Sequence, residues 1–123
     1  MLTDITVIGG INIDIEGSPF AELRREDSNP GTVTMAFGGV GRNITENLAR
    51  MGGKVAMISV IGDDHMGIGA REHLRSLGVD VSLIQSVKGR NSAMYLSILN
   101  HDNDMELAIC DMDIISHITP DLI

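Results

Sequence analysis

Apolar and polar residues alternate along this chain with two periods, one typical of strands and one typical of helices. Residues 5–8 form a short β-branched run, and residues 55–61 form a longer, almost continuously apolar run. Runs of this kind predict strands that are covered on both faces, as in a parallel sheet. Between them, apolar residues recur at helical spacing, at Val40, Ile44, Leu48 and Met51. Two glycines, Gly52 and Gly53, end this pattern, which predicts a helix over residues 40–51.

A second helix and a further strand are predicted after residue 61. Gly62, Asp63 and Asp64 precede a helical pattern over residues 65–77, and Gly78 is placed to end it. Residues 79–84 then predict a short strand. The resulting order of strand, helix, strand, helix and strand is typical of parallel β/α winding. We therefore expect an α/β fold built on a parallel sheet.

Four other segments alternate apolar with polar residues and predict a second, smaller sheet. They are residues 11–17, 32–37, 92–99 and 106–110. The last two flank a turn-rich stretch and predict an antiparallel hairpin. Residues 32–37 predict a strand with one wet face, and residues 11–17 place Asn12 and Asp14 on the same face. We expect these strands to form a small second sheet beside the parallel one.

The composition indicates which kinds of partner the protein can bind and in which cell compartment we expect it. The chain has 123 residues, the length of one small domain, with 9 Lys and Arg against 17 Asp and Glu and no basic run. Nucleic-acid polymers and anionic membranes are therefore poor candidate partners. The single cysteine, Cys110, cannot form an internal disulfide, and we expect it to be a small buried apolar residue. With no signal peptide and no membrane-spanning run in the sequence, these features favour the cytoplasm.

A glycine cluster at residues 38–41 lies just before the first predicted helix. The dinucleotide-binding fingerprint G-x-G-x-x-G would require a third glycine where this chain has Ile44. A Walker A loop would require Gly-Lys followed by Ser or Thr, and neither Lys54 nor Lys88 has that context. Two interpretations remain open. The glycines let a polar ligand approach the helix N-terminus, with Asn43 in its first turn, or they only make a tight strand-to-helix turn.

The spacing from this cluster to later residues is more specific. The chain reads Gly38-Gly39-x-Gly41-x-Asn43-x-Thr45, followed by Gly52 and Gly62. This pattern resembles throughout the N-terminal signature of the ribokinase-like, or PfkB, family of carbohydrate and nucleoside kinases. The segments VIGGINIDI at residues 7–15 and GDDHMG at residues 62–67 are similar to the family's first strand and to its G-D-D-x-x-G motif. The residues GGVGRN and the segment at 107–123 resemble most the pseudouridine kinase branch.

The resemblance implies a fold and a substrate site. The fold would be a ribokinase-like parallel β/α (Rossmann-like) sheet, incomplete in this chain, with a small antiparallel β lid. Residues 1–123 would be the N-terminal part of a single kinase domain, with lid strands at about 11–17, 32–37, 92–99 and 106–110. Asn12 and Asp14 would hydrogen-bond to ribose hydroxyls, and the pocket would be completed by Gly38, Gly39, Gly41 and Asn43.

The resemblance also implies what the whole protein does. It would use ATP and Mg²⁺ to phosphorylate the 5′ hydroxyl of a ribosyl compound, with pseudouridine as the first candidate. Gly10 stands where ribokinases commonly have Asp, which argues against plain ribose. The family's G-A-G-D motif, with its catalytic Asp, and its adenine pocket are absent from these residues, so we expect the fragment alone to be inactive and to bind no cofactor fully. The alternatives are a stand-alone nucleoside-binding or dimerisation module, and a ribokinase- or fructokinase-type sugar kinase. The lid would also offer a face for a homodimer.

Other polar residues carry weaker predictions. Asp63 and Asp64 precede a helix, and we expect them to cap it rather than to act in catalysis. The four histidines show no spacing typical of a metal site. Arg42 could contact a ligand or form a surface ion pair, and the sequence does not decide between the two.

Overall fold

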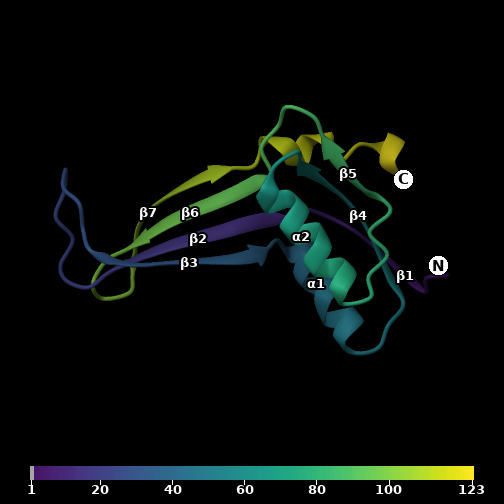
Figure 1. Ribbon diagram of the computed structural model, residues 1–123, viewed down its shortest axis with the longest axis horizontal. Coiled ribbons are helices and arrows are strands. Elements are labelled where there is room, and N and C mark those ends of the chain that lie inside the picture. Colours follow the sequence, from purple (N-terminus) through teal and green to yellow (C-terminus); the bar gives the residue numbers. More distant parts are fainter. Residues whose placement is uncertain (1) are drawn as a thin grey trace.

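Two sheets make up the computed structural model, which describes residues 2–123 (Figure 1). A three-stranded parallel sheet, in the order β1-β4-β5, consists of β1 (Ile5–Ile8), β4 (Val55–Gly62) and β5 (Ile84–Val87). Helix α1 (Val40–Arg50) leads into β4, and helix α2 (His65–Ser76) follows it. The parallel β/α winding predicted from the sequence is confirmed.

A four-stranded sheet, here called the lid sheet, extends away from this body. It has the order β3-β2-β6-β7 and consists of β2 (Asn12–Pro19), β3 (Gly31–Gly38), β6 (Ala93–Leu99) and β7 (Met105–Asp111). The prediction of a purely antiparallel sheet is wrong at its centre, where β2 pairs in parallel with β6. The reason is that both strands begin at the body and run outward, with Asn12 opposite Ala93. The outer pairs, β2 with β3 and β6 with β7, are antiparallel.

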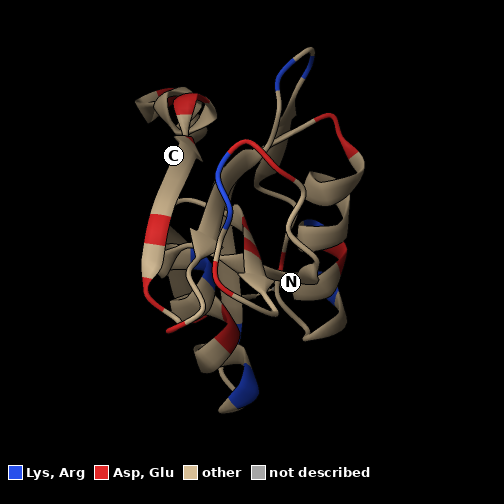
Figure 2. Ribbon diagram, turned by 90° about the vertical axis from the view of Figure 1, so that its left-hand side faces the viewer, with Lys and Arg blue, Asp and Glu red and all other residues tan. Residues whose placement is uncertain are grey.

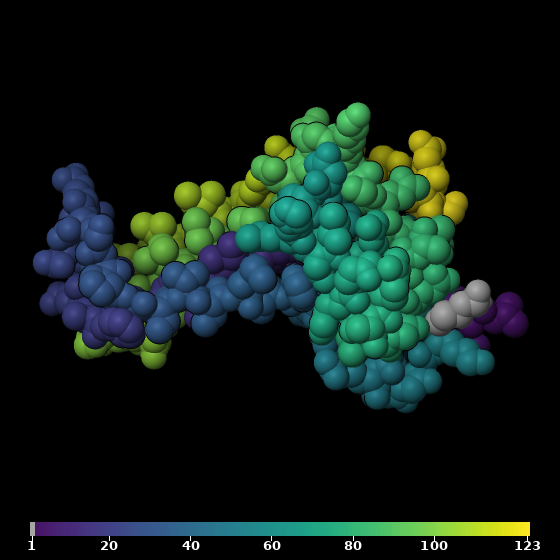
Figure 3. All heavy atoms as spheres, viewed as in Figure 1, coloured from purple at the N-terminus to yellow at the C-terminus, as the bar shows by residue number. Residues whose placement is uncertain are grey.

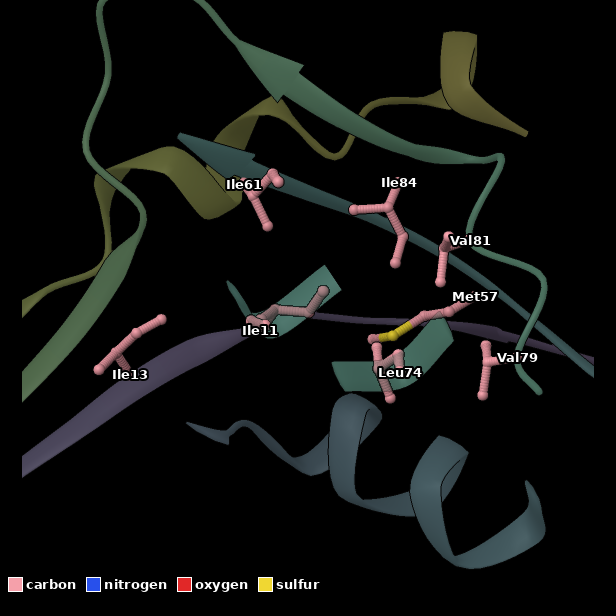
Figure 4. Packing of buried hydrophobic residues seen from close by; sticks show 9 residues of the cluster. Ile11, Ile13, Met57, Ile61, Leu74, Val79, Val81 and Ile84 are labelled. Carbon is pink, nitrogen blue, oxygen red and sulfur yellow. The ribbon is translucent and has the colours of Figure 1, made fainter. Parts of the chain in front are cut away.

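The main hydrophobic core lies between the parallel sheet, α2 and the start of the lid sheet. Figure 4 shows eight labelled side chains of this cluster converging from these elements: Ile11, Ile13, Met57, Ile61, Leu74, Val79, Val81 and Ile84. Because Ile13 belongs to β2, the lid sheet is packed into the core at its base rather than tethered by a loop. Its position relative to α1 is therefore fixed by side-chain packing.

The opposite face of β4 is covered by the end of the chain. Two 3₁₀ helices, η1 (Asp113–His117) and η2 (Pro120–Leu122), pack with Val60 and Ala93 around the buried Ile114. All eight residues of β4 are consequently buried, as expected of the central strand of a sheet that is covered on both sides. Pro120 begins η2, which is a single 3₁₀ turn.

Four local predictions are wrong. Strand β1 is not covered on both faces, because it is an edge strand in which only Val7 is even half-buried. Residues 79–84 do not form a continuous strand: Asp80 makes a single parallel bridge with Ala56 of β4, and its side chain then accepts a hydrogen bond from the Ser82 N–H in a turn, so that β5 begins only at Ile84. Strand β3 is exposed to solvent on both faces over its first six residues, and Val33 on its apolar face is 75% exposed. Cys110 is exposed on the edge strand β7 rather than buried.

The lid sheet gives the molecule an elongated outline. Figure 3 shows it as a narrow arm that projects from the rounder body. The basic positions in Figure 2 are dispersed over separate segments and do not gather in one stripe. Within residues 2–123, every helix is too short or too polar to span a bilayer.

Candidate functional site

An open pocket of about 400 Å³ lies where the lid sheet meets the N-terminus of α1. Seven residues line it: Asn12, Asp14, Gly39, Val40, Asn43, Tyr95 and Met112. They come from β2, from the β3–α1 turn, from the first turn of α1, from β6 and from the segment after β7. Four of the six residues predicted from the sequence as substrate-binding line this pocket, and the other two, Gly38 and Gly41, flank it in the chain.

The polar wall of the pocket is formed by the first residues of β2. Asn12 Nδ2 donates a hydrogen bond of 2.7 Å to Asp14 Oδ1. Both side chains are half-buried on the same face of the strand, while the intervening Ile13 points into the core. This bond fixes the Asp14 carboxylate and leaves its Oδ2 atom free to accept from a ligand hydroxyl.

The glycine cluster keeps this wall accessible by having no side chains. A Cβ on Gly38 would lie 2.2 Å from Asp14 Oδ2, and a Cβ on Gly39 would lie 2.5 Å from the Gly10 carbonyl oxygen. Gly39 also has φ +100°, which L-residues rarely adopt. A Cβ on Gly41 would meet Gly9 Cα at 2.9 Å, so Gly41 lets α1 pack directly on the β1–β2 connection.

Helix α1 points its N-terminus at the pocket. No side chain caps it at Gly39, so the N–H groups of its first turn remain available to a ligand. Thr45 Oγ1 donates to the Gly41 carbonyl at 2.8 Å and is fully buried, which explains the threonine of the signature as a helix-packing residue. Asn43 is exposed in this first turn and lines the pocket.

Three pocket residues, Val40, Tyr95 and Met112, were not predicted from the sequence as site residues. Val40 lies in the glycine cluster, between two predicted residues. Tyr95 lies opposite Asp14 in the parallel register of β2 and β6. That pairing carries no local signal, because an antiparallel arrangement of the same strands would have fitted the alternation equally well. Met112 follows β7 and reaches the pocket only through the path of the chain back toward the body.

Arg42 forms an ion pair, as one of its two sequence interpretations expects, but the pair is not at the surface. Arg42 is 3% exposed, its partner is Glu46, and it is not among the residues that line the pocket. Glu46 also pairs with Arg50 at 2.8 Å. The hydrogen bonds from Arg50 and Arg42 hold the pKa of Glu46 below its ordinary value, so this carboxylate stays charged between the two cations.

The GDDHMG segment forms a structural junction instead of a site. Asp64 caps α2 by accepting from the Gly67 N–H at 2.9 Å, and it also accepts from the Ser92 N–H at 2.7 Å and the Ser92 hydroxyl at 2.6 Å. Burial raises the pKa of Asp64, but these hydrogen bonds outweigh it and lower the pKa below the ordinary value of 3.8. The predicted cap is therefore confirmed for Asp64. It is wrong for Asp63, which instead accepts from the Gly89 N–H at 2.9 Å and anchors the loop before β6.

The remaining titratable residues form no comparable centre. Among residues 2–123, no group of three or more His, Cys, Asp or Glu side chains has a geometry suited to a metal ion. The chemistry that the pocket offers is therefore hydrogen bonding: a carboxylate acceptor, amide donors and the amide end of a helix, around a space open to solvent. These groups have the chemistry to hydrogen-bond to a small polyhydroxylated ligand.

The chain belongs to the pfkB family of carbohydrate kinases, whose model matches residues 2–121. It is 42% identical over 117 residues to sugar kinase YeiI of Escherichia coli, covering 95% of this chain and 32% of that protein. It is 40% identical over 115 residues to pseudouridine kinase of the same organism, covering 94% and 37%. The crystal structure of a Clostridium perfringens protein described as a sugar kinase superposes with a TM-score of 0.92 at 34% identity, covering 98% of this chain and 38% of that one.

These comparisons confirm the family and the ribokinase-like fold expected from the glycine signature. They also show that the chain spans about a third of the length of the curated relatives that it matches. The shared region includes both sheets and the whole pocket, since it runs from residue 2 to residue 121.

Proposed function

We propose that this chain is the substrate-binding N-terminal portion of an ATP-dependent kinase that phosphorylates the 5′ hydroxyl of a ribosyl compound, with pseudouridine as the first candidate. The observation that carries the proposal is the hydrogen-bonded pair of Asn12 and Asp14, held beside the uncapped N-terminus of α1 by glycines that leave no room for a Cβ. Membership of a carbohydrate kinase family and the 40% identity to a pseudouridine kinase support it.

The recognition chemistry follows from the polar groups of the pocket. A ribose presents vicinal hydroxyls, each of which both donates and accepts a hydrogen bond. Asp14 would accept from one hydroxyl, while Asn43 and the first-turn N–H groups of α1 would donate to neighbouring oxygens. A ligand without one of these hydroxyls would leave a pocket group unpaired, and this is a strong source of discrimination.

Catalysis would need groups that this region does not supply. Phosphoryl transfer depends on a cradle for the triphosphate, on Mg²⁺ to neutralise its charge, and on a residue that orients or deprotonates the attacking hydroxyl. We place these functions in the family's C-terminal part and assign none of them to residues 1–123. The 123 residues alone would then bind a ribosyl ligand without transferring phosphate to it.

The direct test uses the full-length product of the gene. We expect titration calorimetry to detect binding of pseudouridine, and an ADP-coupled assay to detect its phosphorylation. The Asp14→Asn variant should bind about tenfold more weakly, because a charged acceptor is lost. Glu16→Gln, two residues further along the same face of β2 and outside the pocket, is the matched control and should bind like wild type. A protein that binds no ribosyl compound and phosphorylates only hexoses would overturn the assignment.

The alternative is a stand-alone nucleoside-binding or dimerisation module. Reading the coding sequence past Ile123 separates the two functions, because a kinase requires a continuation with the G-A-G-D motif. Substrate class within the kinase function is tested by the same calorimetry with inosine, ribose and fructose. A preference for a free sugar would favour the ribokinase- or fructokinase-type alternative.

We also propose that the full-length enzyme acts in the cytoplasm and forms a homodimer through the lid sheet. The face of the sheet opposite the pocket residues carries exposed apolar side chains on both edge strands, namely Val33, Met35, Leu107 and Ile109. Monomeric proteins rarely leave such a contiguous apolar face in water. A second copy of the same sheet would cover it.

A further inference from the structure

Arg42 is a buried cation placed directly behind the pocket. Its side chain is 4% exposed, although it belongs to the first turn of a helix whose other first-turn residues are partly open. Its Nη2 pairs with Glu46, and its Nη1 lies 3.4 Å from His73 Nδ1 on α2. A charge in this position costs free energy unless each of its donors is paired, so the neighbours of Arg42 are part of its function.

Two further donors of Arg42 converge on one atom. Nε donates to Asn43 Oδ1 at 3.2 Å, and Nη2 donates to the same oxygen at 3.0 Å. A guanidinium has only donors, and the amide nitrogen of an asparagine cannot accept a hydrogen bond. The atom that faces Arg42 must therefore be the oxygen. This leaves the Nδ2 amino group as the part of Asn43 available to the pocket.

The charge on Arg42 is balanced without the ligand. Glu46 lies between Arg42 and Arg50, and the hydrogen bonds from these two arginines keep it ionised. Arg42 is thus already paired, and its role in recognition is exerted through Asn43. The neighbouring His73 must present its Nδ1 lone pair to accept from Arg42.

We propose that Arg42 is a positioning residue that locks the Asn43 amide with its N–H groups toward the pocket. The two walls then have complementary polarity: Asp14 offers an acceptor on β2, and Asn43 offers only donors on α1. Asp14 and Asn43 together select a hydroxyl that donates a hydrogen bond to Asp14 and accepts one from Asn43. They reject a ligand that presents only hydrogen-bond donors to α1. This inference rests on the proposed ribosyl ligand.

A double-mutant cycle in the full-length product tests the inference, with pseudouridine titrated by calorimetry. Arg42→Ala is expected to weaken binding about tenfold in the wild-type background and less than about twofold when Asn43 is already Ala. Arg42→Lys keeps the charge beside Glu46 but lacks the planar fork, and should bind as weakly as Arg42→Ala. Arg50→Ala removes the other partner of Glu46 without contacting Asn43 and should bind like wild type. Equal losses from Arg42→Ala in the two backgrounds would overturn the proposal.

A ligand-free measurement separates this inference from the proposed function. The side-chain amide resonances of Asn43, identified in ¹⁵N-asparagine-labelled protein through Asn43→Ala, should shift in Arg42→Lys and stay in place in Arg50→Ala. Unchanged resonances in Arg42→Lys would refute the locked amide even if pseudouridine binds. Failure of wild type to bind any ribosyl compound, with the resonances shifted as expected, would refute the proposed substrate class and not the positioning of Asn43.

Discussion

Removing the Asp64 carboxylate should destabilise the fold far more than removing its neighbour Asp63. Asp64 receives three hydrogen bonds, of 2.9, 2.7 and 2.6 Å, from Gly67 and Ser92. A lost helix cap costs about 1 kcal/mol, and each lost bond to a charged acceptor costs about 1.5–3 kcal/mol, with incomplete additivity. Because Asp64 is partly open to water, we expect Asp64→Ala to cost about 3 kcal/mol, or roughly 10 °C in Tm.

Thermal unfolding followed by circular dichroism measures this difference. Asp63→Ala removes a single bond at an exposed position, from Gly89, and should shift Tm by no more than about 2 °C. Equal shifts in the two variants would refute the reasoning that Asp64 joins α2 to β6. The effects of substitutions on ligand binding should follow a different order from their effects on stability. At temperatures below the unfolding transition, Asp14→Ala should weaken pseudouridine binding much more than Asp64→Ala. Equal losses of affinity would contradict the assigned pocket.

Three further predictions follow from the same contacts. Gly38→Ala places a Cβ against the Asp14 carboxylate and should weaken pseudouridine binding about tenfold in calorimetry. The control is Gly52→Ala: Gly52 has φ +88° and open space around it, so this variant should only lower Tm through backbone strain. The pKa of Asp64 is lower in the folded chain than in the unfolded one, so its stabilisation is fully present above the ordinary value of 3.8 and is lost as pH falls through the folded pKa. The Tm of wild type should accordingly fall more steeply than that of Asp64→Ala between about pH 5 and pH 2, and parallel curves would contradict the lowered pKa. Met35→Lys should convert a dimer to a monomer in analytical ultracentrifugation, while Thr34→Lys, on the opposite face of β3, should not.

The body of the fold follows from the sequence because its signals are local. Residues 55–61 are apolar without interruption, and the glycines after each helix stop the helical pattern where α1 and α2 end. The strand at residues 79–84 was misplaced because its apolar residues, Val79 and Val81, do enter the core. They flank Asp80, which makes a single parallel bridge with Ala56, and a turn held by the Asp80 side chain follows before β5. Alternation alone does not show where the pairing is interrupted.

The lid sheet was less predictable because its pairing is not local. Each strand alternates as expected, but the parallel pairing of β2 with β6 joins segments about eighty residues apart in a way that only the body determines. That pairing brings Tyr95 opposite Asp14 and so completes the pocket wall. The glycine signature, by contrast, identified the α1 side of the pocket, because the glycines that leave no room for a Cβ are adjacent in sequence to the helix N-terminus.

Strand β2 links recognition to folding through its two faces. Its polar residues Asn12 and Asp14 face the pocket, whereas Ile13 between them is fully buried in the core, as is Ile11 just before the strand. A register slip of one residue would exchange these faces, placing a carboxylate in the core and isoleucines in the pocket. The burial of Ile11 and Ile13 therefore does more than stabilise the body. It fixes which side chains of β2 can reach a ligand, and the close packing of Gly9 on Gly41 fixes where α1 meets them.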